Sequence, residues 1–322
     1  MISALALLAV SPDVQGEKVR VAAYNVEWFG EDANPTRIEN LKSVLGNVKA
    51  DVMGFSEIRS RKALGQILGD GWSVGMTDDG EAQENAVAVR APFKLKKWEM
   101  LFPNKALDFA WPGGRDCLRA EVETPGGKSI TVYVLHLKSR GGPSRLGTDA
   151  RREAAAGMLA AWIKARPEEN HVVMGDLNDA PDDRSIRVLA TGDLNAPAGR
   201  PKPGEPTLLK NLFSDLYAKN GVTFGLAEEF RGDPVPPVVP GAMADNDRLR
   251  GIEYRYPQDV RVKQVLFDQI LVSPKIGADG TAVYAGVDAL RGSAGRVRNG
   301  EETVKGTLAS DHLPVHADLT LP

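Results

Sequence analysis

The segment from His171 to Pro181, His-Val-Val-Met-Gly-Asp-Leu-Asn-Asp-Ala-Pro, constrains the fold and function of this chain more than any other. Its apolar run, Val172–Met174, is typical of a short buried strand, and Gly175 permits the turn that brings Asp176 and Asn178 out at the strand end. Because alternate residues of an extended segment share a face, the two polar side chains are predicted to act on one bound group. An ordinary strand-end turn would give the same pattern, so the choice depends on partners elsewhere in the chain.

Composition leaves room for a large core but gives no overall basic surface. The chain has 322 residues, 42% of them hydrophobic, which suffices for one large α/β domain or two ordinary ones. Its formal net charge is -3, so contact with a polyanion requires a local basic patch or a metal ion. The single cysteine, Cys117, excludes an internal disulfide framework and a cysteine-based zinc site, and is expected to be a small buried residue.

The first residues resemble a secretory signal. Residues 2–10 are apolar, but no basic residue precedes them and the run is too short to span a bilayer. We predict that residues 1–16 are a truncated signal peptide and that one domain spans residues 17–322. The protein is then expected to be periplasmic or secreted, with a cytoplasmic location as the alternative.

Strand and helix patterns alternate along the rest of the chain. Helices are predicted from Pro35 and from Asp149 to Arg166, and the Pro- and Gly-rich residues 192–250 predict long loops. Arg151 and Arg152 would then lie in the first turn of the second helix, where cations are unfavourable. This placement suggests a nearby anion, with solvated surface arginines as the commoner alternative. Apolar runs predict strands over residues 19–25, 51–57, 84–90, 115–122, 129–136 and 265–272, and a last strand after Ser310.

Polar residues recur where these strands meet loops. Burying a carboxylate at the end of an apolar run is costly unless it is paired or binds a metal, so packing alone does not explain the pattern. We take the recurring residues as candidate site residues. They are Asn25, Glu57, Glu84, His136, Asp176, Asn178, Asp268, Asp311 and His312.

Seven short motifs carry a resemblance to a known family. In chain order they are AYNVEWF, GFSEI, ENAVAV, LHLKS, GDLND, FDQILVS and SDHLPV, and the match covers about residues 18–320. The chain resembles the endonuclease/exonuclease/phosphatase superfamily, which is DNase I-like, and is most similar to its exported bacterial nucleases. The resemblance implies an α/β (α+β) fold, a four-layer sandwich of two mostly antiparallel sheets packed face to face with flanking helices. The alternation of elements alone would equally have suggested a doubly wound parallel sheet.

The resemblance also implies a metal site. Glu57 would be the principal metal carboxylate, with Asn25 and Asp311 close to the ion or its waters. Hard oxygen ligands of this kind suit Mg2+, with Mn2+ or Ca2+ as alternatives. Asp176 and Asn178 would orient the attacking water and the scissile phosphate.

Two imidazoles are implied as acid, base or phosphate contacts. His312, paired with Asp268, would be a base or a charged phosphate contact. His136, held by Glu84, would protonate the leaving oxygen or bind the phosphoryl group. A carboxylate partner would fix the tautomer of each imidazole and raise its pKa toward the working pH.

Residues beside the site are assigned less directly. Lys138 and Arg119 are predicted to bind substrate phosphates, with simple solvation as the alternative. Trp28 and Phe29 are expected in the core, although an aromatic beside the site could stack on a base.

The prediction is a divalent-metal-dependent phosphodiesterase. It would be a low-specificity endonuclease that hydrolyses DNA, with RNA as a further substrate, by in-line attack of water. We expect a monomer with nucleic acid as substrate and without stable membrane association. The alternative is a phosphomonoesterase or lipid phosphodiesterase, similar to inositol phosphatases or sphingomyelinases, and the non-catalytic alternative is a binding protein on a retired enzyme scaffold.

Overall fold

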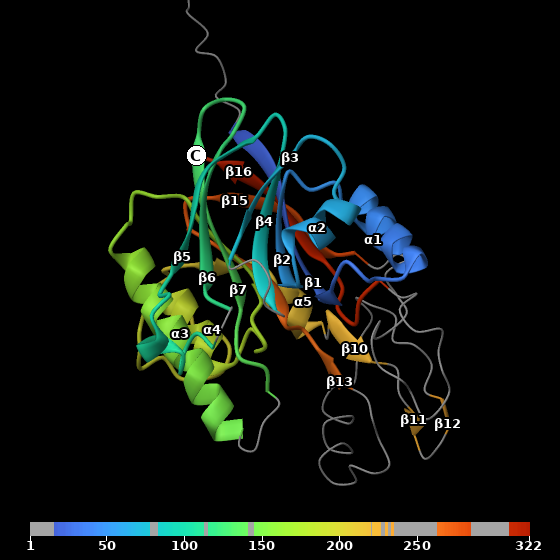
Figure 1. The fold of residues 1–322 in the computed structure, drawn as a ribbon. Coiled ribbons are helices and arrows are strands. Elements are labelled where there is room, and N and C mark those ends of the chain that lie inside the picture. Colours follow the sequence, from blue (N-terminus) through green and yellow to red (C-terminus); the bar gives the residue numbers. More distant parts are fainter. Residues whose placement is uncertain are drawn as a thin grey trace, which may run out of the picture.

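The protein folds into two six-stranded sheets that pack face to face, with helices on their outer faces (Figure 1). The computed structural model describes residues 16–77, 83–112, 115–140, 145–219, 221–226, 229–230, 233–234, 263–284 and 309–322. The four-layer sandwich expected from the resemblance is therefore confirmed. The predicted signal peptide falls outside the described residues except for Gly16, as does most of the segment 220–262.

Both sheets are built from strands that are distant in sequence. Across the first sheet the order is β15 (Gly277–Val283), β16 (Val315–Leu321), β1 (Glu17–Phe29), β2 (Val52–Ile58), β4 (Glu84–Arg90) and β3 (Trp72–Met76). Across the second sheet it is β5 (Lys94–Leu101), β6 (Cys117–Glu123), β7 (Ser129–His136), β8 (His171–Asp176), β14 (Asp268–Val272) and β9 (Lys210–Asn211). Two short pairs add to these, β10 (Phe224–Leu226) with β13 (Lys263–Val265) and β11 (Glu229–Phe230) with β12 (Asp233–Pro234).

Helices cover the outer faces of the two sheets. In Figure 1, α1 and α2 lie on one side of the sheets and α3 and α4 on the other. The helices are α1 (Pro35–Val48), α2 (Arg61–Ile67), α3 (Arg145–Lys164), α4 (Arg184–Thr191) and α5 (Ser214–Ala218), with a 3-10 turn η1 (Lys105–Leu107). Within the described part of the chain, no helix is both long and apolar enough to cross a membrane.

Each sheet contains a single parallel pair, and all its other neighbouring strands are antiparallel. In the first sheet β1 runs parallel to β2 and brings Asn25 level with Ser56. In the second sheet β7 runs parallel to β8 and brings His136 level with Asp176. Because the carboxyl ends of parallel strands meet at one edge, each pair delivers its polar terminal residues to the same place.

Three apolar layers hold the four structural layers together. Alternate residues of β1 and β2, such as Val21 and Val52, meet those of β6 to β8, such as Val132 and Val172, between the sheets. The opposite faces of the sheets pack against α1 and α2 and against α3 and α4 respectively. The period-2 pattern of the strands therefore has apolar residues on both faces, as burial between two layers requires.

Two element boundaries differ from the sequence predictions. Helix α3 begins at Arg145, so Arg152 lies in its second turn, where it is fully buried and ion-paired with Asp149 and Asp179. The anions beside Arg152 are therefore carboxylates of the protein itself. The strand predicted over residues 265–272 is interrupted, because the Thr223 hydroxyl accepts hydrogen bonds from the backbone of residues 267 and 268 and diverts the chain.

An ion pair joins the first and last strands of the first sheet. Arg20 on β1 is the direct cross-strand partner of Asp318 on β16. Its Nε and Nη2 donate to the two carboxylate oxygens at 2.6 and 2.8 Å. These hydrogen bonds lower the pKa of Asp318. The ion pair therefore stabilises the register in which β1 pairs with β16.

Replacing Asp318 with asparagine is expected to lower the free energy of unfolding at pH 7 by about 0.5–1 kcal/mol, because the partly exposed pair is screened by solvent. A carboxyl whose pKa is lowered by folding stabilises above its unfolded pKa, and this contribution is lost as the pH falls through the folded pKa. Urea denaturation should therefore show the wild type and the variant converging below about pH 4. The control is Asp70→Asn, at an exposed aspartate without an ion pair among the described residues. A difference that does not shrink between pH 7 and pH 3 would contradict the assignment.

Candidate active site

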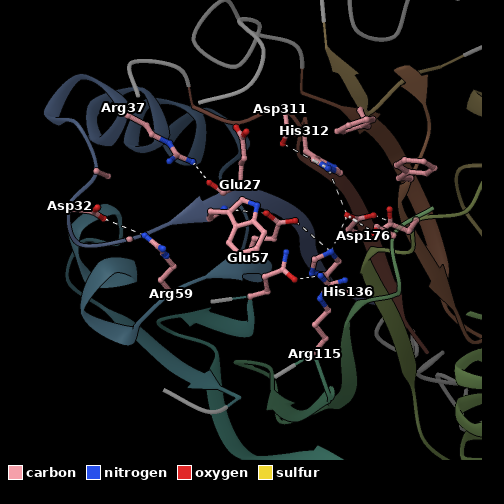
Figure 2. Close-up of a pocket in the computed structure, with 18 of the residues that line it drawn as sticks. Glu27, Asp32, Arg37, Glu57, Arg59, Arg115, His136, Asp176, Asp311 and His312 are labelled. Atoms are coloured by element: carbon pink, nitrogen blue, oxygen red, sulfur yellow. Dashed lines mark hydrogen bonds and ion pairs between the residues drawn. The ribbon is translucent and has the colours of Figure 1, made fainter. Parts of the chain in front are cut away.

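A cavity of about 850 Å³ opens where the two parallel strand pairs end. Figure 2 shows that its lining comes from both sheets and from the loops that follow them. Glu57 and Asp311 come from the first sheet and the segment before β16, whereas His136 and Asp176 come from the second sheet. The cavity therefore gathers residues that are far apart in sequence.

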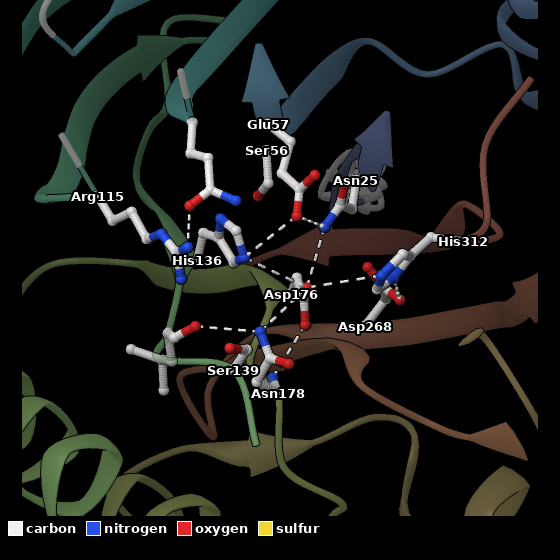
Figure 3. Close-up of polar contacts among 12 residues, drawn as sticks. Asn25, Ser56, Glu57, Arg115, His136, Ser139, Asp176, Asn178, Asp268 and His312 are labelled. Atoms are coloured by element: carbon white, nitrogen blue, oxygen red, sulfur yellow. Dashed lines mark hydrogen bonds and ion pairs between the residues drawn. The ribbon is translucent and has the colours of Figure 1, made fainter. Parts of the chain in front are cut away.

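Asn25 connects the acidic residues of the two sheets. Its amide nitrogen donates to Glu57 Oε1 at 3.2 Å and to Asp176 Oδ2 at 3.0 Å (Figure 3). Burial raises the pKa of Glu57, while the charge of His312 and the Asn25 hydrogen bond oppose that rise. Asn25 thus offers its amide nitrogen, and not its oxygen, toward the two carboxylates.

Asp176 lies between the two imidazoles (Figure 3). Its Oδ2 is 3.6 Å from Nε2 of His136 and 3.7 Å from Nε2 of His312. Burial also raises the pKa of Asp176, and His312 opposes this. One carboxylate oxygen is consequently shared by two imidazoles and by the Asn25 amide.

The Gly-Asp-Leu-Asn turn depends on an obligatory glycine. Gly175 has a φ of 137°, and a Cβ built there would lie 2.1 Å from the carbonyl oxygen of Leu135. Asn178 has a φ of 51°, so it is not the extended residue that the shared-face argument assumed. It nevertheless faces Asp176, because its N–H donates to Asp176 Oδ1 at 2.9 Å and its amide donates to the Leu137 carbonyl at 3.0 Å.

The surroundings of the two imidazoles shift their pKa values in opposite directions. Burial, with the charges of Arg115 and His312, holds the pKa of His136 well below its ordinary value. Burial also acts against a charge on His312, but Asp268 and Asp176 outweigh it and raise the pKa of His312 well above the ordinary value. His312 Nδ1 is 2.8 Å from Asp268 Oδ2, which is the pairing expected from the sequence. His312 is therefore charged near neutral pH while His136 is neutral.

The structure does not pair His136 with Glu84. Glu84 accepts a hydrogen bond from the Thr77 hydroxyl. Nδ1 of His136 is buried without a hydrogen-bond partner among the residues that the structure describes. The carboxylates nearest to the His136 ring are Glu57 and Asp176, at 3.6 Å each. The role of Glu84 as the partner that fixes the His136 tautomer therefore stays a prediction.

Arg119 is also absent from the site. Leu118 and Ala120 face the core between the sheets, so Arg119 points to the opposite face of the second sheet. There its guanidinium pairs with Glu99, Glu121 and Glu169 at 2.8 to 3.3 Å. A side chain with three carboxylate partners on the wrong face does not bind a substrate phosphate, so that prediction is wrong.

Lys138 and Asp311 lie beside or in the cavity. Nζ of Lys138 donates to the hydroxyl of Ser139, which lines the cavity, at 2.9 Å. Asp311 lines the cavity itself, with Oδ1 4.0 Å from His312 Nε2. Their roles in phosphate and metal binding stay predictions.

Arg115 and Trp28 are two of the cavity residues that the sequence analysis missed or misplaced. Arg115 lines the cavity next to His136, although it was taken only as the start of a strand. The hairpin register could have revealed it, because Leu118 pairs with Val134 and the residues just before β6 therefore reach the end of β7. Trp28 was expected in the core but is 46% exposed and lines the cavity, whereas Phe29 is buried as expected.

The acidic end of the cavity fits a hard divalent cation. Glu57 and Asp176 are buried carboxylates with raised pKa values, so their negative charge is only partly offset by neighbouring donors. Carboxylate oxygens are the ligands that Mg2+ and Mn2+ prefer, and a cation would remove this electrostatic cost. Because Asn25 presents its amide nitrogen, it would act on the carboxylates and not as a direct oxygen ligand in this arrangement.

A second group of potential ligands is less suited to a metal. Single donor atoms of Asp176, Asp268 and His312 lie within 4.8 Å of one another. The His312 ring, however, is already hydrogen-bonded to Asp268 through Nδ1 at 2.8 Å, and a cation bound by these donors would have to disturb that contact. Glu57 is thus the better position for a cation.

Comparison with known proteins identifies the family. The sequence model of the Endonuclease/Exonuclease/phosphatase family matches residues 22–312. The chain belongs to this family. The expected superfamily membership is therefore confirmed, while no curated protein sequence matches the chain.

Solved structures of the Endonuclease/Exonuclease/phosphatase family share the fold at low sequence identity. A humanized D. rerio TDP2 is 16% identical with a TM-score of 0.61, over 94% of this chain and 99% of that chain. A family protein from Bacteroides thetaiotaomicron is 15% identical with a TM-score of 0.59, over 96% and 99%. A mannosyl-6-phosphatase from the same organism is 14% identical with a TM-score of 0.57, over 94% and 100%.

Replacing Glu57 with glutamine is expected to weaken Mn2+ binding by about 10- to 100-fold, the range found when an interaction that supports a metal site is removed. Because a bound ion stabilises only the folded state, Mn2+ should raise the melting temperature of the wild type at lower concentrations than that of the variant. Thermal unfolding across a Mn2+ titration measures this shift. The control is Glu39→Gln, an exposed glutamate paired with Lys42 on α1. Equal Mn2+ responses in all three proteins would contradict a metal site at Glu57.

Proposed function

We propose that this protein is a divalent-metal-dependent phosphodiesterase that hydrolyses DNA as a low-specificity endonuclease. Membership of the Endonuclease/Exonuclease/phosphatase family supports a metal-dependent phosphoester hydrolase. The observation that carries the proposal is the position of Asp176, whose Oδ2 faces the Nε2 atoms of both imidazoles at 3.6 and 3.7 Å. This arrangement surrounds one point of the cavity with groups that can bind and protonate phosphate oxygens.

The proposed chemistry assigns a different task to each group. A divalent cation beside Glu57 would neutralise charge on a phosphoryl oxygen. Asp176, fixed by hydrogen bonds from Asn25 and Asn178, orients the attacking water. In-line attack places negative charge on the equatorial and leaving oxygens, which nearby cations and hydrogen-bond donors stabilise.

The imidazoles divide between charged and neutral roles. His312 is held by Asp268 and carries a positive charge, so its Nε2–H suits a contact with a phosphate oxygen that gains charge. His136 is neutral and hydrogen-bonds to the phosphoryl group. This division disfavours the acid role for His136 and the base role for His312. The proton lost by the attacking water passes to Asp176, whose pKa is raised by burial, and the charged His312 protonates the leaving oxygen.

Cationic side chains on both sides of the site favour a substrate with more than one phosphate. Arg59 follows β2 in the first sheet and Arg115 precedes β6 in the second, and both line the cavity. A nucleic acid chain presents a phosphate on each side of the scissile one, so each arginine could contact one. A D. rerio TDP2 of the same fold has been solved in complex with a single-strand DNA product, which supports this choice of substrate.

Export and a monomeric state accompany the proposal as predictions. Residues 1–15 lie outside the described residues, so the proposed signal is argued from sequence alone. Phosphomonoester or lipid phosphodiester hydrolysis is the competing outcome, because a mannosyl-6-phosphatase has the same fold.

Incubation of supercoiled plasmid with the full-length protein and Mg2+ is expected to produce nicked DNA, and EDTA should prevent it. Replacing His136 or His312 with alanine should reduce the nicking rate by about 100- to 10,000-fold, the range for removing one hydrogen-bond donor to the transition state or one general acid. The matched control is His316→Ala, because His316 lies on β16 and does not line the cavity. Gel electrophoresis of a time course measures the rates.

Two outcomes would count against DNA as the substrate. Intact plasmid together with release of inorganic phosphate from monoesters would favour a phosphomonoesterase. Intact plasmid together with hydrolysis of sphingomyelin would favour a lipid phosphodiesterase. Equal rates for the His136, His312 and His316 variants would reject the proposed site itself.

A further inference from the structure

Trp28 is an exposed aromatic side chain at the edge of the cavity. Its exposed fraction is 46%, although it belongs to a strand whose neighbouring residues Val26 and Phe29 are fully buried. The other large hydrophobic residues with high exposure in the described part of the chain do not line the cavity. They are Trp98, Phe109, Leu146 and Leu194.

The backbone that carries Trp28 has an unfavourable conformation. Glu27 and Trp28 have φ values of 42° and 52°, in the left-handed region that residues with a Cβ rarely adopt. The pairing of β1 with β2 shifts register between Asn25 and Phe29, so these residues form a bulge. A bulge of this kind redirects side chains out of the sheet, which explains how Trp28 leaves the core.

Hydrogen bonds hold the bulge from three directions. The N–H of Trp28 donates to Glu57 Oε2 at 3.2 Å, and the N–H of Glu27 donates to Asn25 Oδ1 at 3.0 Å. Arg37, buried on α1, donates to the carbonyl oxygens of Val26 and Glu27 at 2.5 and 2.7 Å. The main chain of Trp28 is therefore fixed directly beside the carboxylate assigned to the metal, while its indole stays accessible.

The cavity is also aromatic beside His312. Phe224 packs against the His312 ring with centroids 4.7 Å apart and stacks on Phe267 at 5.6 Å. Trp28 thus lies on the Glu57 side of the cavity, and the two phenylalanines lie on the His312 side. A phosphodiester between two nucleosides has a base-bearing group on each side, which matches this distribution.

We propose that Trp28 selects substrates that carry a nucleobase, whatever its identity, by stacking on the base on the Glu57 side of the scissile phosphate. The inference rests on the proposed phosphodiesterase function and makes it more specific. Stacking on an indole tolerates every base, because each base has a flat π-face, so it suits an enzyme of low sequence specificity. Fixing the backbone lowers the entropic cost of using an exposed side chain for this purpose.

The test uses single-stranded oligothymidylates in which only one central linkage is hydrolysable and the others are phosphorothioates. Two analogues replace either the thymine before or the thymine after that linkage with a base-less tetrahydrofuran. Trp28→Ala is expected to reduce kcat/KM on the complete substrate by about 5- to 100-fold, mainly through KM, which is the range for loss of one stacking aromatic. One of the two analogues should cause a similar loss in the wild type and little additional loss in Trp28→Ala.

Two further variants control for folding and for general effects of tryptophan loss. Trp28→Phe retains a ring and is expected to keep most of the preference for the base-bearing substrate. Trp98→Ala removes the other exposed tryptophan, which lies on β5 outside the cavity, and should leave the rates unchanged. Melting temperatures close to that of the wild type would verify that the variants are folded.

The possible failures are distinguishable. If the wild type hydrolyses DNA but Trp28→Ala loses no activity, or loses the same factor on all three substrates, the stacking role is overturned while the proposed function stands. If the wild type hydrolyses neither these substrates nor plasmid DNA, the proposed function fails and the inference fails with it.

Discussion

The hydrogen bonds from the Asn25 amide connect the two sheets at the point where their acidic residues meet. Glu57 belongs to the first sheet and Asp176 to the second, and each accepts from the same amide nitrogen. Negative charges on the partly buried Glu57 and the buried Asp176 repel each other, and burial already raises the pKa of both. The amide offsets part of that cost, and a divalent cation would offset more. A cation bound beside Glu57 would therefore add to the charge of His312 in stabilising the two carboxylates.

The strand topology explains why this centre lies where it does. Each sheet has one parallel pair, and each of these pairs ends at the cavity. A purely antiparallel sheet would send neighbouring strand ends to opposite edges, so Asn25 could not lie beside Glu57, nor His136 beside Asp176. Face-to-face packing then brings the two edges together. The fold is thus linked to function through two strand pairings, and the remaining strands and helices mainly supply the apolar layers that support them.

Much of the fold and part of the site could be predicted from the sequence. Asp176 and His312 could be located because each stands at the end of an apolar run, where burying a polar side chain is costly without a functional reason. The four-layer architecture followed from the resemblance. Arg119 was misplaced because a basic residue in a strand says nothing about which face it occupies, and here the face carries three glutamates. The hydrogen bond from the Thr77 hydroxyl to Glu84 could not be predicted, because nothing in the sequence relates a threonine after one strand to a glutamate at the start of the next. Trp28 was assigned to the core because a regular strand would bury it, and only the left-handed bulge exposes it.

Backbone strain is concentrated at the cavity. Glu27, Trp28, Glu57 and Asn178 all have positive φ, and each such non-glycine residue typically costs about 1–3 kcal/mol. Each is held by hydrogen bonds to another site residue or to Arg37, so the strain persists only while the network is intact. Because the same bonds that hold the strained residues also orient Asp176 and Glu57, loosening one of them would displace several functional groups together. The exposed indole of Trp28 follows from this strain, since a relaxed strand would return it to the core and leave the Glu57 side of the cavity without an aromatic surface.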